Sequence, residues 1–563
     1  MAGIDRGAVA THLRATAAWL RFRGEKGFRA RAYDNGADAI EAVARFEELV
    51  DDKKLTTVRG IGGALAAQID ELVSTGTTKH LDELRGDLPI GLPLLAEQAK
   101  LSPKVVTTLF QKFGIASYEA LVAAARAGQL SGMRGLGPKT EARFIEGGRP
   151  EPTNATGRVT LDEAMQLATD VSAVLRNLDP EVNIAIAGEF RRALETVAAV
   201  ELVVGSERPL ALLEAILAWA GPGESTRRNE DTVEVTLPRG LQVIVHAVQR
   251  ARFAQALLEA TGPTHHVVQV MELQLGNAQG GADHQSEEAI YASAGLPFIP
   301  PELRDSIAVI ETALEGKRFD DLVVRADVRG MVHCHTLYSD GRNSVLEMAR
   351  AAEALGFSYI TITDHSPTAH YAGGLDLERL EAQWAEIDEV QSQVNIRLLR
   401  GTESDITREG ALDYPDRILE KLDVVIASIH NRYRLDSQGM TERVVSAMRH
   451  PIFKIWGHAL GRILLSRDPI ACDVERIFDV IAESRAAIEI NGDPKRLDLP
   501  PALIPAARKR GIRFVLSSDA HSTNGLLAID YAVAMARRGG LTAADILNTG
   551  SVDDFIAAVR PQS

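Results

Sequence analysis

The sequence predicts a multidomain protein of mixed α+β and α/β class, with a helical region, then an α+β region, then a parallel β/α barrel of seven strands. Three observations lead to this prediction. The chain has 563 residues, which is more than one hydrophobic core usually organises. Glycine turns separate short amphipathic helices in the first 150 residues. After residue 325, seven β-like runs alternate with helical stretches, the pattern of a parallel barrel.

Composition narrows the class of protein. At 45% hydrophobic and 25% charged residues, the chain is typical of soluble globular proteins. The first residues are amphipathic and charged with no long apolar run, so we expect neither a signal peptide nor a membrane span. The two cysteines, Cys334 and Cys472, are too few for a disulfide framework, and this favours a reducing cytoplasm.

Charge is distributed unevenly along the chain. The net charge is -15, but residues 1–150 hold 21 Lys and Arg against 18 Asp and Glu, or +3, which leaves -18 for the remainder. A nucleic-acid contact is therefore expected mainly in the N-terminal part, where backbone donors would supplement a modest positive charge. The acidic remainder suits cation binding.

The first 150 residues contain a small internal repeat. Amphipathic helices are predicted at residues 9–21, 37–49, 63–73, 103–113, 118–127 and 140–145. Two glycine turns of the form apolar-x-Gly-apolar-Gly each open a helix, one with Gly60 and Gly62, the other with Gly135 and Gly137. Such a turn presents backbone N–H groups and a positive helix end, which suits a phosphate. One copy could be a tight turn alone, but two matching copies indicate helix-hairpin-helix motifs that hold the DNA backbone without reading bases.

An α+β region follows a polar stretch, TNATG, at residues 153–157. Strands are predicted in VNIAIAG, VELVV, TVEVTL and LQVIVHAV, with helices between them. A second linker, ETALEGKRFDD, leads into the barrel region.

The barrel region carries the most informative pattern. Its seven runs are MVHCH, YITITDH, IRLLRGTES, VVIASIH, FKIWGH, AIEIN and RFVLSSDAH. Six of them end in candidate metal ligands, which are His333, His335, His365, Glu403, His430, His458, Asp519 and His521. Asp340 lies in the loop after the first run and can reach the same place. Side chains at the C-terminal ends of barrel strands converge on one mouth, so we expect these nine to meet there.

Spacing supports the convergence. His333 and His335 are two residues apart, as are Asp519 and His521, which on a strand places each pair on one face. Cys334 then points the other way and is not a ligand. A single histidine is more often an ordinary residue, and His370 and His450 are left as such, but six strand-terminal histidines rarely arise by chance.

Imidazoles and carboxylates without thiolates suit zinc, manganese or iron. Nine ligands exceed one tetrahedral ion and imply two or three. Clustered ions activate water and clamp a phosphate with its leaving group, so hydrolysis of a phosphoester is the predicted reaction.

The motifs HCHTLYSDG, ITDHS, GTESDI, ASIH, GHALGR and SSDAHS resemble the polymerase and histidinol phosphatase (PHP) domain found behind bacterial family X DNA polymerases. The resemblance covers residues 326–563 and fills all nine ligand positions. It implies three metal ions, the first held by His333, His335, Glu403 and Asp519, the second by Glu403, His430 and His458, and the third by Asp340, His365 and His521. Met331, where relatives often have Asp, is not a ligand position.

Residues 1–316 resemble the core of a family X polymerase, with IYASAGLPFIPPELR as a close match to its end. The resemblance implies a helix-hairpin-helix small domain at 1–80, a fingers-like domain at 81–151, a palm-like nucleotidyltransferase domain at 158–250, a thumb-like domain at 251–318 and the PHP domain, a distorted barrel, at 326–563.

The palm keeps one, Glu201, of the three carboxylates with which the family holds two magnesium ions for nucleotidyl transfer. Where the family has Gly-Ser followed by Asp-x-Asp and a third Asp, this chain has Glu189 in place of the serine, then Ala199 and Glu201, then Ile244. An anion at Glu189 would repel a triphosphate. We therefore expect no magnesium at the palm and no polymerase activity, unless a shifted acid such as Glu195 or Glu234 replaces the lost ones.

Two smaller features complete the expected site. Arg432 and Arg462 follow ligand histidines closely and could bind a substrate phosphate, although solvent-facing ion pairs are equally consistent with the sequence. Removal of an abasic sugar by a lyase needs a lysine amine that forms a Schiff base with the sugar. The helix after the first hairpin, ALAAQIDELV, has no lysine, so we expect no lyase activity.

The sequence thus favours a cytoplasmic bacterial DNA-repair phosphoesterase, a monomer that trims DNA 3′ ends as a 3′-5′ exonuclease. The family resemblance adds 3′-phosphates and abasic sites as substrates, and DNA ends or gaps as sequence-independent partners. Three alternatives stay open: an active gap-filling polymerase with exonuclease, a small-molecule phosphatase acting on compounds such as histidinol phosphate, and a non-catalytic DNA-end scaffold.

Overall fold

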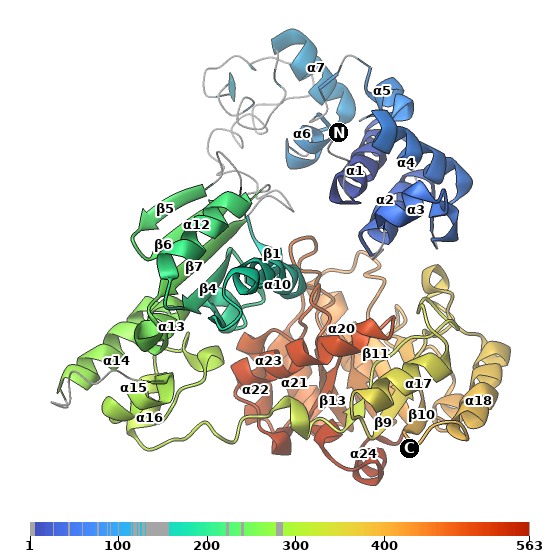
Figure 1. Cartoon of the computed structure of the whole chain (residues 1–563). Helices are drawn as coiled ribbons and strands as arrows, with labels where there is room; N and C mark the ends of the chain where they lie inside the picture. Colours follow the sequence, from blue (N-terminus) through green and yellow to red (C-terminus); the bar gives the residue numbers. More distant parts are fainter. Residues whose placement is uncertain are drawn as a thin grey trace. The chain divides into compact units, whose positions relative to one another are not determined.

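The computed structural model describes residues 6–561 except for the gaps 26–27, 43–45, 59, 76–77, 87, 90–91, 100, 114, 116–120, 122–123, 126–129, 131–156, 221–224, 238–240 and 277–284. The chain divides into two compact units, Met1–Ala155 and Thr156–Ser563. Figure 1 shows the first unit in blue and the second in green to red.

The first unit consists of helices. They are α1 (Arg6–Phe22), α2 (Phe28–Ala42), α3 (Phe46–Asp51), α4 (Gly63–Thr75), α5 (Lys79–Arg85), α6 (Leu92–Ala99) and α7 (Pro103–Phe113), with a short 3-10 turn at Leu55–Thr57. Helix α1 is buried on two sides, because Leu13 packs in a core with Ile69 of α4 while Trp19 packs in another with Leu109 of α7.

The first glycine turn adopts the expected hairpin. Gly60 has φ +96°, a conformation that favours glycine, and the buried Ile61 donates its amide to the Val58 carbonyl at 3.0 Å. A Cβ at Gly62 would meet nothing within 4 Å, so the backbone at the start of α4 is open to a ligand. The second turn, with Gly135 and Gly137, lies outside the described residues, as do the predicted helix at 140–145 and most of that at 118–127.

The helix predicted at 37–49 is wrong in its boundaries. Helix α2 begins at Phe28 and runs through Gly36, and α3 is a separate helix. A Cβ at Gly36 would come within 2.3 Å of Leu65 Cδ2, so glycine allows α2 and α4 to approach closely. This packing outweighs the low helix propensity of a glycine inside α2.

The second unit opens with a five-stranded sheet in the order β2-β4-β7-β6-β5 (Figure 1, green). Its strands are β2 (Asn183–Ala187), β4 (Ala199–Gly205), β5 (Ser225–Asn229), β6 (Thr232–Thr236) and β7 (Gln242–Val248), and β1 (Val159–Thr160) pairs separately with β3 (Thr196–Val197). Helices α10 (Leu161–Leu178) and α12 (Pro209–Ala220) bury Leu175 and Ile216 in the same core as Leu202 and Val204 of β4. Four strand predictions in this region are confirmed.

A second group of helices follows the sheet and has a core of its own. It contains α13 (Phe253–Thr261), α14 (Thr264–Gly276), α15 (Glu287–Ser293) and α16 (Val309–Leu314), whereas α11 (Gly188–Arg191) comes between β2 and β4 in the chain. The buried Arg304 donates to Glu287 at 2.9 Å, and Glu287 also accepts a bond from Arg191, which ties this group to α11.

The barrel has the predicted seven parallel strands in sequential order, from β8 to β14. They are β8 (Gly330–Met331), β9 (Tyr359–Ile362), β10 (Arg397–Asp405), β11 (Val424–Ser428), β12 (Lys454–Trp456), β13 (Ala486–Asn491) and β14 (Phe514–Ser517). The helices between them are α17 (Val345–Ala354), α18 (Leu377–Gln391), α19 (Asp416–Leu419), α20 (Ser437–Arg449), α21 (Val474–Glu483) and α22 (Ile504–Lys509), and α23 (Ile529–Arg538) follows the last strand. The first and last strands meet through a parallel bridge between Cys334 and Ala520, which nearly closes the barrel.

The barrel interior is apolar at one end and polar at the other. Residues from β9 to β14, among them Leu399 and Ile455, form one buried cluster with Phe555 and Val559 of α24 (Val552–Val559). The Phe555 ring stacks on Tyr359 with 5.1 Å between centroids. Helix α24 therefore closes the N-terminal end of the barrel, and the polar groups gather at the C-terminal ends of the strands.

Five strands, β8, β9, β11, β12 and β14, end before the predicted runs do. β8 ends at Met331 and β14 at Ser517, so the His333/His335 and Asp519/His521 pairs lie just beyond them, and Asp519 has φ +52°. The Cys334–Ala520 bridge still places the two pairs side by side. Among the described helices, none combines the length and apolar character needed to cross a bilayer.

Candidate metal centre

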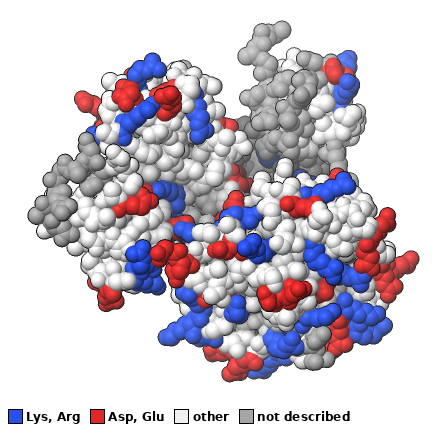
Figure 2. Space-filling view, turned by 60° about the horizontal axis from the view of Figure 1, so that its bottom comes forward, with Lys and Arg blue, Asp and Glu red and all other residues white. Residues whose placement is uncertain are grey.

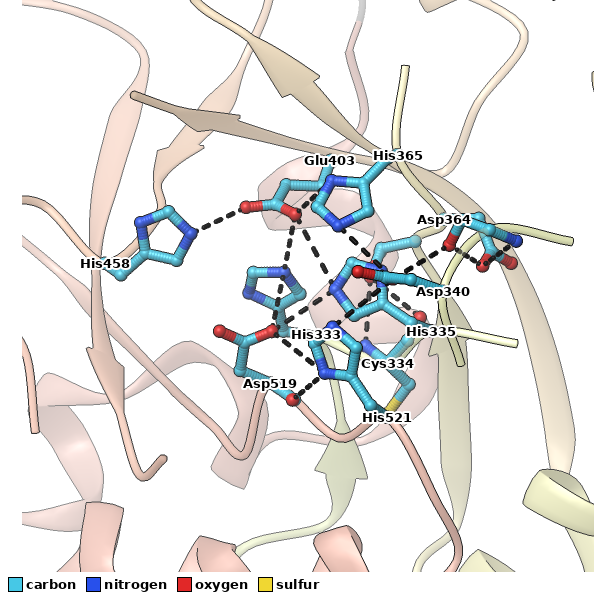
Figure 3. A network of polar contacts seen from close by, with 12 residues as sticks. His333, Cys334, His335, Asp340, Asp364, His365, Glu403, His458, Asp519 and His521 are labelled. Carbon is cyan, nitrogen blue, oxygen red and sulfur yellow. Dashed lines mark hydrogen bonds and ion pairs between the residues drawn. The ribbon is translucent and has the colours of Figure 1, made fainter. Parts of the chain in front are cut away.

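The nine predicted ligands come from six strand ends and one loop, and the structure brings them together at the C-terminal mouth of the barrel (Figure 3). Three overlapping groups of ligand atoms each lie within 4.8 Å of one another: His335, Asp340, His365 and His521; His333, His335 and Asp519; and His365, Glu403 and His430. His458 joins them through its Nε2, which is 2.8 Å from Glu403 Oε1.

Glu403, on β10, stands at the centre of this cluster and is 1% exposed. Its Oε1 lies 3.3 Å from His430 Nε2 and faces His458. Its Oε2 lies 2.9 Å from His365 Nδ1, and 3.5 and 3.6 Å from the Nε2 atoms of His333 and His335. The two oxygens thus face different sets of imidazoles, the arrangement of a carboxylate that can bridge two ions.

Two aspartates extend the cluster in opposite directions. Asp519 is buried, with Oδ1 3.2 Å from His335 Nε2. Asp340 Oδ1 is 3.4 Å from His365 Nε2 and 3.3 Å from His521 Nε2. The side chains of Asp340 and His521 are 37% and 39% exposed, so the cluster opens to solvent on their side and is closed around His333.

Charge inside the cluster shifts the pKa values strongly. Burial lowers the pKa of His365, but Glu403 and Asp340 outweigh it and raise that pKa to about 10. His521 follows the same pattern, with Asp340 and Asp519 raising its pKa to about 9. Burial and the neighbouring His521 and His365 lower the pKa of His335 to about 3. Protons on some of these rings therefore occupy positions that cations could take.

Two carboxylates behind the ligands were not predicted. Glu489 Oε1 lies 2.6 Å from His333 Nδ1, and Asp405 Oδ1 lies 3.0 Å from His430 Nδ1. Such contacts orient an imidazole so that its other nitrogen faces a metal. A signal existed in the sequence: Glu489 and Asn491 end β13, the one strand without a predicted ligand, and Asp405 is two residues from Glu403.

A third carboxylate, Asp364, holds the loop that carries Asp340. It is buried and accepts bonds from the Thr336 hydroxyl at 2.6 Å and from the Ser339 hydroxyl, and the Gln383 amide donates to it at 2.6 Å (Figure 3). Burial raises the pKa of Asp364, which fits a residue that organises a loop.

The two arginines proposed for phosphate both donate to backbone carbonyls. Arg432 donates to the carbonyls of Gly461 at 2.9 Å and Asp468 at 2.7 Å. Arg462 donates to the carbonyls of Arg496, at 2.9 Å, and Leu497, and pairs with Glu195 of the five-stranded sheet region. A different arginine, Arg496, is nearest the ligands, with its Nε 3.3 Å from Asp519 Oδ2.

The palm-like sheet holds one of the expected acids. Strand register pairs Glu201 on β4 with Ile244 on β7, and Ile244 with Glu234 on β6, so the three side chains share one face. Glu201 Oε2 lies 3.5 Å from His246 Nε2, and Glu234 accepts a bond from Gln242 at 2.5 Å.

Glu189, which stands where the family has serine, forms hydrogen bonds with nearby residues. Its carboxylate accepts bonds from Arg158 at 2.9 Å and from the Ala198 amide at 3.0 Å. Glu195 is also engaged, since it pairs with Arg462.

Family comparisons match three parts of the chain. The model described as PHP domain matches residues 332–493, the helix-hairpin-helix domain matches 5–78, and the SAM-like helix-hairpin-helix tandem matches 95–147. A "Probable phosphatase" of Caldanaerobacter subterraneus is 31% identical over 39% of this chain and 87% of its own length. One of Thermoanaerobacter sp. is 29% identical over 40% of this chain and 92% of its own length.

Similarity to a further relative extends beyond the barrel. The "DNA polymerase/3'-5' exonuclease PolX" of Bacillus subtilis is 28% identical over 97% of this chain and 98% of its own length. Together with the matched barrel and the phosphatase relatives, this shows that the chain belongs to the PHP domain family and is similar to PolX over nearly its whole length.

Proposed function

We propose that this chain is a metal-dependent DNA-repair phosphoesterase that hydrolyses DNA at 3′ ends as a 3′-5′ exonuclease. The observation that carries the proposal is the convergence of nine imidazole and carboxylate side chains at one barrel mouth. The name of the Bacillus subtilis relative, which includes a 3′-5′ exonuclease, supports DNA as the substrate. Removal of 3′-phosphates and incision at abasic sites also hydrolyse phosphoester bonds, and we propose them as further activities of the same metal centre.

The donor set fits divalent metal ions. The Nε2 atoms of His333 and His335 are buried and make no hydrogen bond with any described residue, although carboxylate oxygens lie 3.2 to 3.6 Å away. We propose manganese, zinc or iron, because the ligands are imidazoles and carboxylates without thiolates. Three ions would be held as follows: the first by His333, His335, Glu403 and Asp519, the second by Glu403, His430 and His458, and the third by Asp340, His365 and His521.

Divalent ions bound in this way supply an activated water and stabilise charge on the phosphate. The protein's own residues perform the remaining tasks. Glu489 and Asp405 orient ligand rings, and the apolar barrel below the cluster excludes water from one side. The exposed side near Asp340 and His521 is the approach for a substrate.

We propose that the N-terminal unit holds DNA without reading its sequence. Two matched helix-hairpin-helix families and the open backbone at Gly62 support phosphate contacts there. Figure 2 shows a face of the molecule on which acidic and basic side chains are interspersed. Residues 1–150 carry a net charge of only +3, so backbone donors matter more there than a continuous basic surface. We expect the protein to act as a monomer on ends or gaps.

The palm-like region is proposed to serve as a scaffold without polymerase activity. One expected acid remains, Glu201, and Ile244 stands next to it in the sheet. The two candidate replacements, Glu195 and Glu234, have other partners. Template-directed incorporation by the purified protein that disappears in Glu201→Ala would favour the alternative of an active gap-filling polymerase.

A small-molecule phosphatase is the second candidate, because the probable phosphatases align with only 39% and 40% of this chain. It leaves the matched helix-hairpin-helix regions without a role. Turnover of a 3′-recessed duplex compared with that of histidinol phosphate separates the two functions.

The central test combines metal analysis with a nuclease assay. Wild type should contain stoichiometric metal and shorten a 3′-recessed duplex, whereas the His333→Ala, His335→Ala double variant should lose both properties. His450→Ala, outside the cluster, is the matched histidine control. Wild type without bound metal would instead favour a non-catalytic DNA-end scaffold.

A further inference from the structure

Arg496 brings a partly uncommitted guanidinium to the metal centre. Its Nε is 3.3 Å from Asp519 Oδ2 and 3.7 Å from Asp493 Oδ2. Its Nη1 is buried and hydrogen-bonds to no residue that the structure describes. A buried donor without a partner is costly unless a ligand satisfies it. Arg496 therefore has a donor available for an acceptor at the mouth of the barrel.

The backbone around Arg496 is held firmly. Its amide donates to the Asp493 carbonyl at 2.7 Å, and its carbonyl accepts a bond from Arg462 Nε at 2.9 Å. Arg462 also donates to the carbonyl of Leu497. Arg462, which the sequence suggested as a phosphate ligand, thus supports the segment from which Arg496 projects.

A second arginine, Arg467, is exposed beside this segment. It ends a turn in which its amide donates to the Ile463 carbonyl at 2.7 Å, and Leu464 in the same turn donates to the Lys495 carbonyl at 2.7 Å. From the other side, Arg432 donates to the carbonyl of Asp468 at 2.7 Å. These bonds place Arg467 between Arg432 and Arg496.

The positive charges of these three arginines act on one another. Burial lowers the pKa of Arg467, and the positive charges of Arg496 and Arg432 lower it further. Like charges that gather in one place repel one another, and an incoming phosphate relieves this repulsion. These arginines provide positive charge beside the metal-binding cluster.

An aromatic side chain completes the rim. Tyr371 is 69% exposed, and its ring centroid is 6.2 Å from that of His365 and 5.9 Å from that of His430, edge-on in both cases. A large exposed aromatic ring next to metal ligands offers a stacking surface. Nucleobases stack on such rings without regard to sequence.

We propose that Arg496, Arg467 and Tyr371 form a nucleotide-binding rim on the metal centre, at which Arg496 binds the phosphate being cleaved, Arg467 binds an adjacent phosphate and Tyr371 stacks on a base. The inference rests on the proposed phosphoesterase function and specifies its substrate class. A DNA strand, which has bases and more than one phosphate, contacts all three residues. A small phosphate ester uses Arg496 alone.

The test compares two substrates in metal-loaded full-length protein: a 3′-recessed duplex and glycerol 3-phosphate, a phosphate ester without an aromatic ring. Arg467→Ala and Tyr371→Ala should each lower kcat/KM on the duplex about tenfold and leave the small substrate within about twofold of wild type. Tyr371→Phe keeps the ring and should match wild type on both. Arg417→Ala, an exposed arginine of α19 ahead of β11, is the matched control.

Binding provides a readout that is independent of turnover. Fluorescence anisotropy with a labelled phosphorothioate trithymidylate should show about tenfold weaker binding by Arg467→Ala and by Tyr371→Ala. Arg496→Ala should weaken the use of both substrates while metal content stays at the wild-type level. Loss of metal in Arg496→Ala would mean that this residue only neutralises Asp519, and would overturn its assignment to phosphate.

Failure of the rim and failure of the proposed function give different results. If wild type cleaves the duplex and Arg467→Ala and Tyr371→Ala cleave it equally well, the rim is wrong and the nuclease function stands. If wild type cleaves only the small substrate, the nuclease function is wrong. In that case the trithymidylate binding measurement tests the rim independently of cleavage. Unchanged binding by Arg467→Ala and by Tyr371→Ala would overturn the rim.

Discussion

Glu489 Oε1 lies 2.6 Å from Nδ1 of His333, and this contact turns Nε2 of the same ring toward Glu403 and Asp519. The other Glu489 oxygen accepts the backbone amide of His458, and the Ser517 hydroxyl donates to Oε1 at 2.6 Å. One buried carboxylate on β13 thus orients parts of three neighbouring strand ends, although it is not itself a predicted ligand.

Glu489→Gln should weaken metal binding by about 10- to 100-fold, because a neutral amide of similar size orients His333 less strongly. Competition with a chelator measures this change as a shift in metal affinity. Glu483→Gln, an exposed glutamate of α21, is the matched control and should bind metal as wild type does. Equal affinities for the two variants would contradict the orienting role.

Metal affinity should rise as the pH increases from about 6.5 to about 9, because ions must displace protons from His365 and His521, whose pKa values are about 10 and about 9. The sign follows from their raised pKa values: these rings are protonated in the metal-free fold at neutral pH. Chelator competition across this range measures the slope. His521→Ala should show a shallower slope, and an identical slope would mean that His521 does not titrate with binding.

The pKa of His266 produces an acid sensitivity away from the metal centre. Burial, and then the charge of Arg304, lowers this pKa to about 3, and His266 Nε2 lies 2.7 Å from the Tyr291 hydroxyl. The folded state therefore holds the ring neutral while the unfolded chain protonates it below about 6.5. The stability from this residue is complete above about pH 6.5 and is lost as the pH falls toward about 3.

His266→Gln should consequently lose less stability than wild type between about pH 7 and about pH 5. Thermal unfolding of both proteins at each pH measures the difference, since all other titrating groups are shared. If the melting temperatures of the two proteins fell equally with pH, the His266 ring would not be held neutral in the fold.

Phe555→Ala should destabilise the barrel by about 3 to 5 kcal/mol, because it leaves a cavity under the stacked Tyr359 ring at the closed end. Chemical denaturation followed by a barrel-specific probe measures the loss. Ala557→Ser on the exposed side of α24 should leave the unfolding midpoint unchanged. A wild-type midpoint for Phe555→Ala would mean that α24 does not close the barrel.

The seven barrel strands and their order could be predicted because apolar runs of strand length alternate with helical segments along the whole region. The sequence also predicts that the nine imidazole and carboxylate side chains lie close together, since chain topology alone brings the C-terminal ends of parallel strands to one mouth, and the structure places their nitrogen and oxygen atoms there. The boundaries of α2 could not be predicted from the sequence, because they depend on the close approach of Gly36 and Leu65, which lie in different helices.

Which side chains lie at the barrel mouth can be read from the sequence, since imidazoles and carboxylates at successive strand ends of a parallel barrel converge there, and their chemistry suits divalent metal ions. The partners of the arginines depend on the fold: Arg432 and Arg462 donate to carbonyls, while Arg496 faces Asp519. The physical reason is that an arginine reaches several partners from one backbone position. Its choice among carbonyls, carboxylates and an open site depends on neighbours that come together only when the chain folds.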